Sequence, residues 1–123
     1  YVQYAHARIC SILKTLAADG IDVRPATAEE LSLLTAPEER ELIVHLACLP
    51  QEICVAARDY DPARITRYVI ELATLFHKFY NAHRVRLPEN EPLMQARIAL
   101  CLAVKTVLHN VLTMFRISVP DHM

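Results

Sequence analysis

The sequence predicts an all-α fold, an antiparallel bundle of about five or six helices. Three observations lead to this prediction: the chain has a single glycine, its apolar residues recur at helical spacing, and no alternating apolar–polar run is long enough for a sheet. Hydrophobic residues make up 54% of the 123 residues and charged residues 22%, a composition that excludes disorder. Because this length supports one core, residues 1–123 are expected to form a single domain.

The first part of the chain predicts one long helix and one short helix. Residues 1–18 carry an apolar stripe at three- and four-residue spacing, and Gly20 should end the helix that they form. Thr27–Glu30 is a capping-box pattern, in which a threonine and a glutamate three residues later can satisfy each other's backbone N–H groups. It should open a short helix through Leu34.

The middle of the chain predicts further helical segments. Thr35–Glu38 repeats the capping pattern and should begin a helix that Pro50 breaks or kinks before residues 51–58 continue. A long helix should then span residues 61–82, with Asp61 as its side-chain cap and a proline in the first position. We expect its buried stripe to contain Ile65, Val69, Leu72, Phe76 and Phe79, and its exposed face to contain Arg64, Arg67, Glu71, Lys78 and Asn81.

The last helix should be the most buried one. Asn90 can cap it, and it should run to about Phe115 with apolar residues on nearly all sides. Its longest apolar stretch, residues 98–112, contains polar residues and is too short for a bilayer, so no membrane partner is expected. Residues 117–123 should form a non-helical tail that is either docked or frayed.

Charge is divided unevenly along the chain although the net charge is −1. Residues 1–61 carry five basic and ten acidic side chains, whereas residues 62–123, with Arg84, Arg86 and Arg97 among them, carry eight basic and four acidic ones. A basic half can attract a polyanion. An ordinary mixed helical surface is the equally weighted alternative.

The cysteines and histidines lack the spacing of a disulfide framework or a zinc site. Cys10, Cys48, Cys54 and Cys101 contain no CxxC pair, which favours reduced core thiols in a cytoplasmic protein. No HxxxH or HExxH pair occurs, so no metal site is expected. Cys48 follows His45 by three residues, but their apolar surroundings argue against a nucleophilic pair, and no catalytic residue is predicted.

Aromatic and basic residues are interleaved in residues 76–86, a pattern that suits single-stranded RNA. Unstacked bases can lie on aromatic rings or guanidinium planes while arginine and lysine meet phosphate. Tyr80 follows Phe79 and should therefore turn toward the rim, with Arg84 just beyond it. The alternative is that Tyr80 belongs to the core.

A second candidate lies near the N-terminus. Tyr1, Tyr4 and Arg8 fall on one helical row, and His6 lies off that row. A tyrosine–arginine row of this kind either ties its helix to a neighbouring helix or contacts a ligand directly. The sequence leaves both roles open.

Several segments, in the right order along nearly the whole chain, resemble the C-terminal anticodon-binding domain of arginyl-tRNA synthetases. These segments are Tyr1–Arg8, Leu49–Ala57, Asp61–Val85, Ala96–Asn110 and Val119–Met123. The signature Asp-Ala-Leu-Arg has no intact copy here, and Asp-Pro-Ala-Arg occupies roughly its place at residues 61–64. The family commonly has glycines where this chain has Val111 and Arg116, and often arginine in place of His122.

The resemblance implies a helical domain that grips the anticodon loop of arginine tRNA. The parent would be a class I synthetase that attaches arginine to its tRNA with ATP and magnesium, and a cytoplasmic monomer. By position, Tyr80 and Met123 match family residues that contact anticodon-loop bases. Our own additions from charge and aromatic pattern are Arg84, Tyr4, His6 and Arg8.

The resemblance also implies that this chain is a fragment whose catalytic domain lies elsewhere. The chain starts without methionine, and the nucleotide signatures of class I synthetases are absent from it. We therefore expect no cofactor in this chain and no catalysis by it alone. The alternative from another class is a stand-alone helical protein-interaction module that kept the fold without RNA binding.

Overall fold

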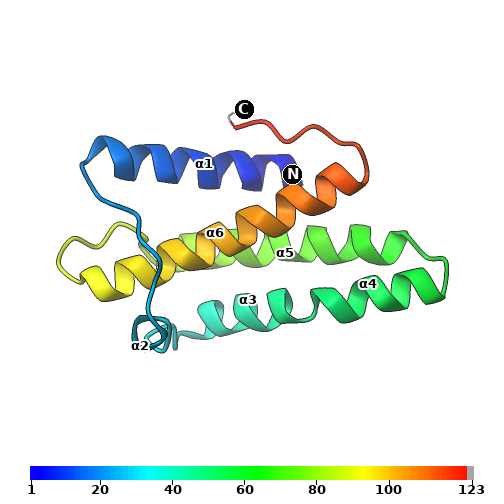
Figure 1. Ribbon diagram of the computed structural model, residues 1–123, viewed down its shortest axis with the longest axis horizontal. Coiled ribbons are helices and arrows are strands. Elements are labelled where there is room, and N and C mark those ends of the chain that lie inside the picture. The colour runs from blue at the N-terminus through cyan, green and yellow to red at the C-terminus, as the bar shows by residue number, and fades with distance from the viewer. Residues whose placement is uncertain (122–123) are drawn as a thin grey trace.

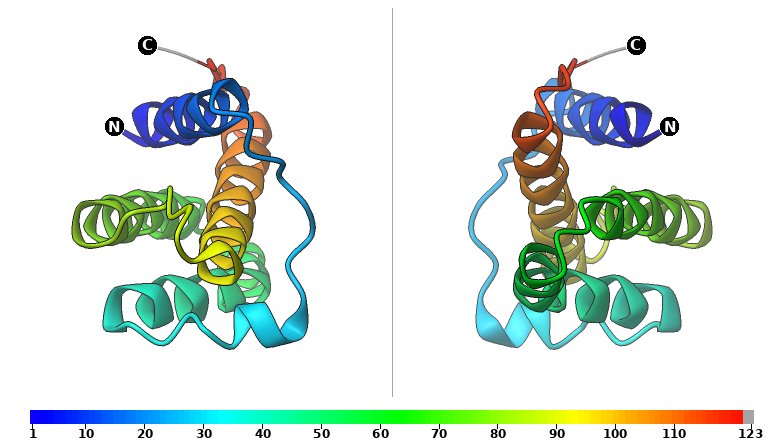
Figure 2. Two further views of the ribbon diagram at one scale, coloured as in Figure 1. Left: turned by 90° about the vertical axis from the view of Figure 1, so that its left-hand side faces the viewer. Right: turned by 90° about the vertical axis from the view of Figure 1, so that its right-hand side faces the viewer.

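The computed structural model describes residues 1–121, which form helices and no strands (Figure 1). Figure 2 shows α1, α5 and the α3–α4 pair stacked in layers, with α6 crossing them on one side. The all-α prediction is confirmed. The helices are α1 (Val2–Ala18), α2 (Ala28–Leu31), α3 (Pro37–Ala47), α4 (Leu49–Arg58), α5 (Ala63–Ala82) and α6 (Glu91–Met114).

The bundle is not antiparallel throughout, because α1 and α5 run in the same direction (Figure 1). Tyr4 meets His77 with 5.7 Å between ring centroids, and one turn further along both helices the Arg8 guanidinium meets Tyr80. The two helices are not joined directly, since α2, α3 and α4 lie between them in the chain. Their C-terminal ends therefore lie at the same end of the molecule.

The central helix is α6, as the sequence predicts. It packs against α1, α2, α3 and α5, and side chains such as Ile98, Val104 and Leu108 are at most 1% exposed. Within the described residues it is the one helix whose length and mean hydropathy of 1.3 would allow a membrane crossing. Such values are also typical of a core helix, and α6 carries buried Gln95 and Arg97 against its neighbours.

The linker between α1 and α2 is held by a buried polar side chain of α6. Gln95 is 1% exposed, and its Nε2 donates to the Asp22 carbonyl at 2.8 Å while its Oε1 accepts from the Arg24 N–H at 3.3 Å. A buried amide that satisfies backbone groups in this way fixes a segment that has no helical bonds of its own.

The short helix α2 begins as predicted but ends earlier. The capping box between Thr27 and Glu30 is present in full. The helix ends at Leu31 instead of Leu34, because the N–H groups of Leu33 and Leu34 donate to carbonyls only three residues back. This tighter turn places Leu34 in the core.

The start of α3 corrects the second capping prediction. Its cap is Ala36, whose N–H donates to Glu39 Oε1 at 3.1 Å, so Thr35 and Glu38 do not form the expected box. This choice places Pro37 in the first position of the helix, where a missing N–H costs least. The Glu38 carboxylate instead pairs with His83, the residue that follows α5. A break in this region is confirmed, but it lies at Cys48 and not at Pro50. α3 ends at Ala47 and α4 begins at Leu49, so Pro50 lies in the first turn of α4, where a proline is tolerated.

The start of α5 is one residue later than predicted. Pro62 takes the cap position, and no side chain caps the helix. The Asp61 carboxylate instead accepts from Arg67 Nη2 at 3.4 Å. The preceding Tyr60 has a φ of 51°, in the left-handed region, and reverses the chain between α4 and α5.

The end of α6 is left-handed at Arg116, a position where the resemblance predicts glycine. Arg116 has a φ of 58°, and the Ile117 N–H donates to the Leu112 carbonyl at 2.8 Å, a geometry typical of a left-handed helix end. Glycine adopts this conformation without steric cost, and the family commonly has glycine here. At the end of α1, Gly20 has a φ of 75°, as its predicted role requires.

Candidate nucleic-acid interface

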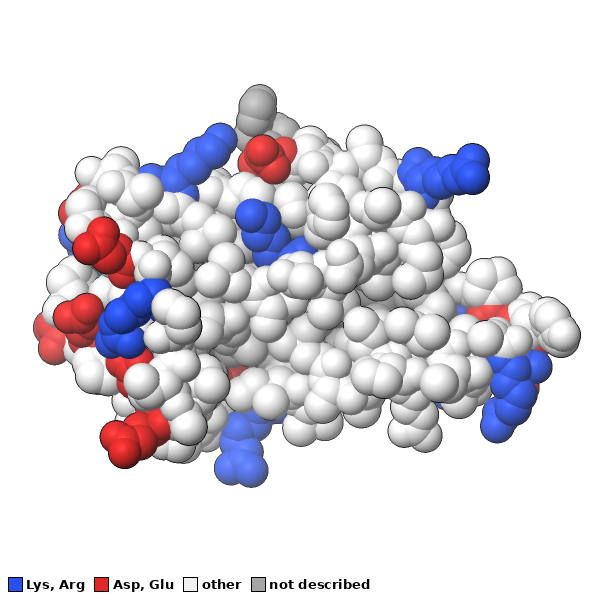
Figure 3. Space-filling view, in the orientation of Figure 1, with Lys and Arg blue, Asp and Glu red and all other residues white. Residues whose placement is uncertain are grey.

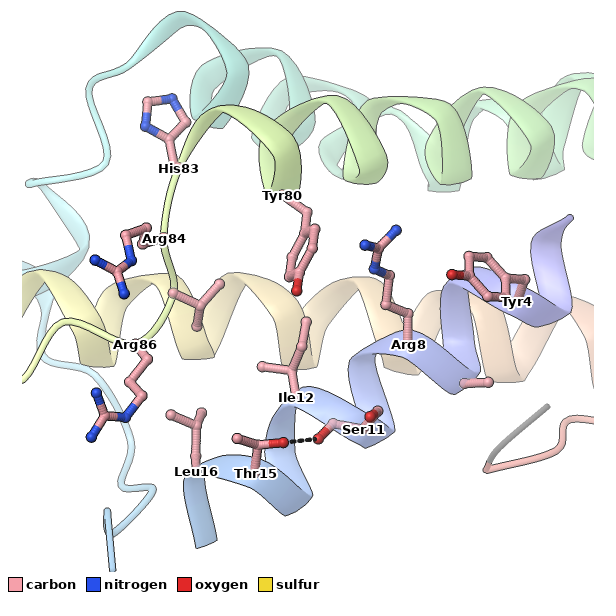
Figure 4. A pocket seen from close by; sticks show the side chains of 12 residues that line it. Tyr4, Arg8, Ser11, Ile12, Thr15, Leu16, Tyr80, His83, Arg84 and Arg86 are labelled. Atoms are coloured by element: carbon pink, nitrogen blue, oxygen red, sulfur yellow. Dashed lines mark hydrogen bonds between the residues drawn. The ribbon is translucent and has the colours of Figure 1, made fainter. Parts of the chain in front are cut away.

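A groove of about 580 Å³ lies between α1 and the C-terminal end of α5 (Figure 4). α1 contributes Tyr4 and Arg8, α5 contributes Tyr80, and the segment after α5 contributes Arg84 and Arg86. Four of the six residues that the sequence singled out, Tyr4, Arg8, Tyr80 and Arg84, therefore line one cavity. They converge because α1 and α5 lie side by side and run in the same direction.

The Arg8 guanidinium lies between two aromatic rings. Its Cζ atom is 4.2 Å from the ring centroid of Tyr80 and 5.8 Å from that of Tyr4. This cation–π arrangement holds the planar guanidinium in one orientation. It also covers part of the Tyr80 ring, while the Tyr80 hydroxyl points into the groove toward Ile12 (Figure 4).

Tyr80 is neither a core residue nor a freely exposed one. Its ring is half-buried and packs against Phe76, with 6.2 Å between centroids, whereas Phe76 and Phe79 are fully buried. Within residues 1–121 its hydroxyl makes no hydrogen bond. The ring is thus fixed by the core, and the polar end stays available to a ligand.

An aromatic cluster extends the groove along α1. His77 packs against Tyr1 at 5.4 Å and Tyr4 at 5.7 Å between centroids, so this row ties α1 to α5. Both ring nitrogens of His77 are shielded from solvent and have no partner among the described residues. Burial, and after it the charge of Arg8, lowers the pKa of His77 below 6.5 and keeps the ring neutral at pH 7.

The two arginines after α5 differ in their partners. Arg86 Nε donates to Asp19 Oδ2 at 2.8 Å, which ties the segment to the end of α1. The exposed Arg84 side chain has no carboxylate partner in the described part of the chain. Arg8 has none there either. Two guanidinium groups of this groove therefore carry a positive charge that no carboxylate of the described chain balances, and an anionic ligand can do so.

A buried ion network holds the segment that carries Arg84. Arg97, 8% exposed, donates from Nε to Glu39 Oε2 at 2.9 Å and from Nη1 to the Arg84 carbonyl at 2.8 Å. His83 Nε2 lies 2.7 Å from Glu38 Oε1, and its Nδ1 lies 3.5 Å from Arg97 Nη2. These contacts fix the backbone of residues 83–84 from α3 and α6 together.

The predicted basic half does not become a basic face. Arg97 is buried, and Arg64, which we expected on the exposed face, is half-buried and donates to Glu52 at 2.6 Å. Lys78 is exposed as expected but pairs with Glu41 at 3.1 Å. Figure 3 shows acidic side chains gathered at the left end, over α2 and the start of α6, and a largely uncharged centre. Three arginines, one from α1 and two from the segment after α5, line the groove.

The structure does not bring His6 to the groove. His6 is 2% exposed, its Nδ1 lies 3.2 Å from the Pro120 carbonyl, and burial lowers its pKa. Gln3 Nε2 also donates to the Ser118 carbonyl at 2.8 Å, so the tail docks on α1 through residue 121. The structure therefore places His6 beneath the tail and not in the groove, and its contact with RNA stays a prediction. Met123 lies outside the described residues.

The cysteine prediction is half correct. All four thiols are free, and Cys10 and Cys101 are buried, but Cys48 and Cys54 are exposed on the α4 side of the bundle. His45 stacks on Tyr68 at 4.2 Å and its Nε2 lies 2.9 Å from the carbonyl of that residue. Its ring is thereby committed to α5 and makes no hydrogen bond to Cys48 in the described chain.

One cluster that sequence reasoning missed lies where the tail meets α1. Potential ligand atoms of His6, Cys10 and Asp121 all lie within 4.8 Å of one another. The spacing of His6 and Cys10 places them on one face of a helix, which was a usable signal. The third residue lies 111 positions further along the chain, so no local pattern could include it.

The fold and the groove together define a helical recognition domain, with aromatic rings and unpaired arginines where a catalytic site would hold acids, bases or nucleophiles. The chain belongs to the family of the DALR anticodon binding domain, whose model matches residues 2–123. The prediction drawn from the sequence resemblance is confirmed.

Curated relatives agree with this assignment. The arginine–tRNA ligase of Caldanaerobacter subterraneus subsp. tengcongensis is 53% identical over 123 residues, and that of Ruminiclostridium cellulolyticum is 50% identical. The whole chain is covered in both cases, but it spans only 22% of either relative. The solved structure of Thermus thermophilus arginyl-tRNA synthetase matches the whole chain with a TM-score of 0.81 at 30% identity, over 21% of that protein.

Proposed function

We propose that this chain is the anticodon-loop-binding part of an arginine–tRNA ligase and that the groove between α1 and α5 contacts the RNA. The observation that carries the proposal is the Arg8 guanidinium stacked on Tyr80 at 4.2 Å, at the edge of a groove that also holds unpaired Arg84. Single-stranded RNA is recognised by this combination of ring, guanidinium plane and phosphate-binding cation. The family name and the arginine–tRNA ligase relatives support the same function.

The groove residues divide the work of recognition between charge and stacking. Arg84 meets the phosphate backbone, because its charge is not balanced by a carboxylate in the described chain. A base displaces the Arg8 guanidinium from between the two rings to reach the ring of Tyr80. The Tyr80 hydroxyl can then hydrogen-bond to the edge of a base, which stacking alone would not provide.

The catalytic step belongs to the rest of the parent protein. ATP and magnesium are what the proposed ligase activity needs, and the described residues do not fit them: the groove contains no glycine-rich loop, and arginine side chains, not carboxylates, supply its charge. We therefore place adenylation and arginine transfer outside this chain. We further propose a cytoplasmic, monomeric parent, in keeping with the arginine–tRNA ligase relatives.

The proposal is tested by binding the 123-residue chain to the anticodon stem-loop of an arginine tRNA. Tyr80→Ala should weaken binding by about 1–3 kcal/mol, roughly 5- to 150-fold, because a stacked or hydrogen-bonded base loses its partner. Tyr80→Phe separates the two contributions, since it keeps the ring and removes the hydroxyl. Fluorescence anisotropy titrations at fixed salt measure both variants, and removal of Met123 should also weaken binding severalfold.

The matched control is Tyr60→Ala, which removes a tyrosine that is 92% exposed in the α4–α5 turn, away from the groove. Circular dichroism should show the same helical spectrum for every variant. Equal affinities of the unmodified chain, Tyr80→Ala and Tyr60→Ala would overturn the assignment of the groove. No RNA binding by any of them at low salt would favour the protein-interaction module instead.

A further inference from the structure

We propose that His6, Cys10 and Asp121 form a binding site for a zinc-like transition-metal ion that fastens the C-terminal tail to α1. Nothing in the proposed anticodon recognition uses these three side chains. The site would bind a thiophilic divalent ion through one nitrogen, one sulfur and one oxygen. The three ligand atoms lie close together, and the side chains of His6 and Cys10 are buried.

The three atoms lie close to the separations that a tetrahedral ion requires. His6 Nδ1 lies 3.8 Å from Cys10 Sγ, which lies 3.8 Å from Asp121 Oδ1. Zinc bonds of about 2.0–2.3 Å to nitrogen, oxygen and sulfur place tetrahedral ligands about 3.4–3.6 Å apart. All three atoms already fall within 4.8 Å of one another, so their separations need to shorten by a few tenths of an ångström to about 1.4 Å to complete the triangle.

Two of the ligands are presented rigidly, and the third comes from the tail. His6 and Cys10 stand one turn apart on α1 and are 2% and 6% exposed, so neither has freedom to turn away. Asp121 is exposed and closes the site from the solvent side. The fourth position of a tetrahedral ion is thereby left to water.

The donor set selects the class of ion. A thiolate and an imidazole favour zinc or cobalt over magnesium and calcium, which prefer oxygen ligands. The thiolate and the carboxylate carry two negative charges, which balance a divalent ion beside Lys105 and His109, the basic groups near His6. Binding releases the thiol proton of Cys10 to solvent, and no oxidant or reductant is needed.

Hydrogen bonding alone accounts poorly for the cluster. A thiol is a weak donor and acceptor, and both sulfur contacts are as long as 3.8 Å. His6 Nε2 is shielded from solvent without a partner in the described chain, so this imidazole gains only one good hydrogen bond, to the Pro120 carbonyl. A metal bond at Nδ1 would replace that contact with a stronger one.

The test is a cobalt titration of the 123-residue chain in which the exposed thiols are removed by Cys48→Ser and Cys54→Ser. Cys101 does not compete, because its side chain is 1% exposed in the core and belongs to no cluster of potential ligand atoms in the described chain. One equivalent of Co²⁺ should produce the near-ultraviolet thiolate-to-cobalt absorption and the visible bands of a tetrahedral ion, and Zn²⁺ should displace it. Cys10→Ser should abolish the absorption.

A second variant keeps the proposal testable if Cys10→Ser does not fold. Asp121→Asn changes one exposed oxygen and should weaken cobalt binding about tenfold or more. Asp59→Asn, at an exposed aspartate between α4 and α5, is the matched control and should bind as before. The proposal is overturned by no absorption at one equivalent, by absorption that survives Cys10→Ser, or by equal affinities of Asp121→Asn and Asp59→Asn.

Discussion

Two neighbouring regions of this domain use arginine in opposite ways. In the network formed by Glu38, Glu39, His83 and Arg97, every charged group has a partner within 3 Å. In the groove formed by Tyr4, Arg8, Tyr80, Arg84 and Arg86, two of the three guanidinium groups have no carboxylate partner in the described chain. The first arrangement stabilises the fold, and the second leaves charge for a ligand.

Arg84 belongs to both regions. Its carbonyl accepts from buried Arg97 in the network, while its side chain lines the groove. The closed network therefore positions the open site, since it fixes the backbone from which the unpaired cation projects. Stability and RNA affinity should therefore respond to different substitutions, at Arg97 and at Arg84, although the Arg97 side chain contacts the Arg84 backbone.

The largest expected effect on stability comes from removing the Arg97 guanidinium from the buried ion network. Arg97→Met removes the partner of a glutamate that is 1% exposed and leaves its charge buried, which should lower the free energy of unfolding by about 3–5 kcal/mol. It also frees the Arg84 carbonyl. Urea unfolding monitored by circular dichroism measures the change. The control Arg67→Met, at an exposed pair with Asp61, should cost less than about 1 kcal/mol.

Replacing both partners of the ion pair by apolar residues tests whether the unpaired buried charge causes the loss of stability. Arg97→Met combined with Glu39→Leu should recover a large part of the lost stability, because no unpaired charge then remains in the core. If the single and double variants unfold at the same urea concentration, the ion pair is not what holds this region.

Removing a charge from the groove should leave the stability of the fold unchanged and weaken RNA binding. Arg84→Gln keeps the backbone contact with Arg97 and removes the unpaired charge. The salt dependence of binding to the anticodon stem-loop should fall by about 0.7–0.9 in the slope of log K against log salt, the contribution of one phosphate contact. Arg58→Gln, at a side chain 72% exposed and paired with Asp59 outside the groove, should leave the slope unchanged.

The reverse result would contradict the separate roles of the network and the groove. A large loss of stability in Arg84→Gln would mean that its side chain belongs to the closed network. An unchanged slope would mean that phosphate is met elsewhere on the molecule.

Sequence reasoning succeeds where the determinants are local. The capping residues Thr27 and Asn90 act within three residues of themselves, so they are correctly predicted as helix starts. The predicted cap at Thr35 is wrong: Ala36 begins the helix through Glu39, and Glu38 contacts His83, 45 residues away. No local window of sequence contains that contact.

The candidate site shows the same limit. Tyr80 and Arg84 could be predicted because they share one helix end, and the row of Tyr4 and Arg8 because it has helical spacing. That the two sets face one groove depends on α1 and α5 being parallel, which follows from packing against α6. The burial of His6 depends likewise on a tail that returns to α1 from the far end of the chain.

The smallest expected effect concerns the aromatic edge of the groove, where His77 lies between Tyr1 and Tyr4. His77→Phe keeps the ring stack and removes two shielded nitrogens that have no partner in the described chain, so it should stabilise the fold by about 1 kcal/mol at pH 7. Urea unfolding at pH 7 and at pH 5 measures this gain and its dependence on pH.

The sign of the pH effect follows from the lowered pKa of His77 in the fold, which arises from burial and then from the charge of Arg8. Below pH 6.5 the unfolded chain binds a proton that the folded chain does not, so stability is complete above that pH and declines as the pH falls. His77→Phe should therefore lose less stability between pH 7 and pH 5 than the unmodified chain. An equal loss in both proteins would show that His77 keeps its ordinary pKa in the fold. The His77 ring would then be exposed to water, as the Arg84 side chain is.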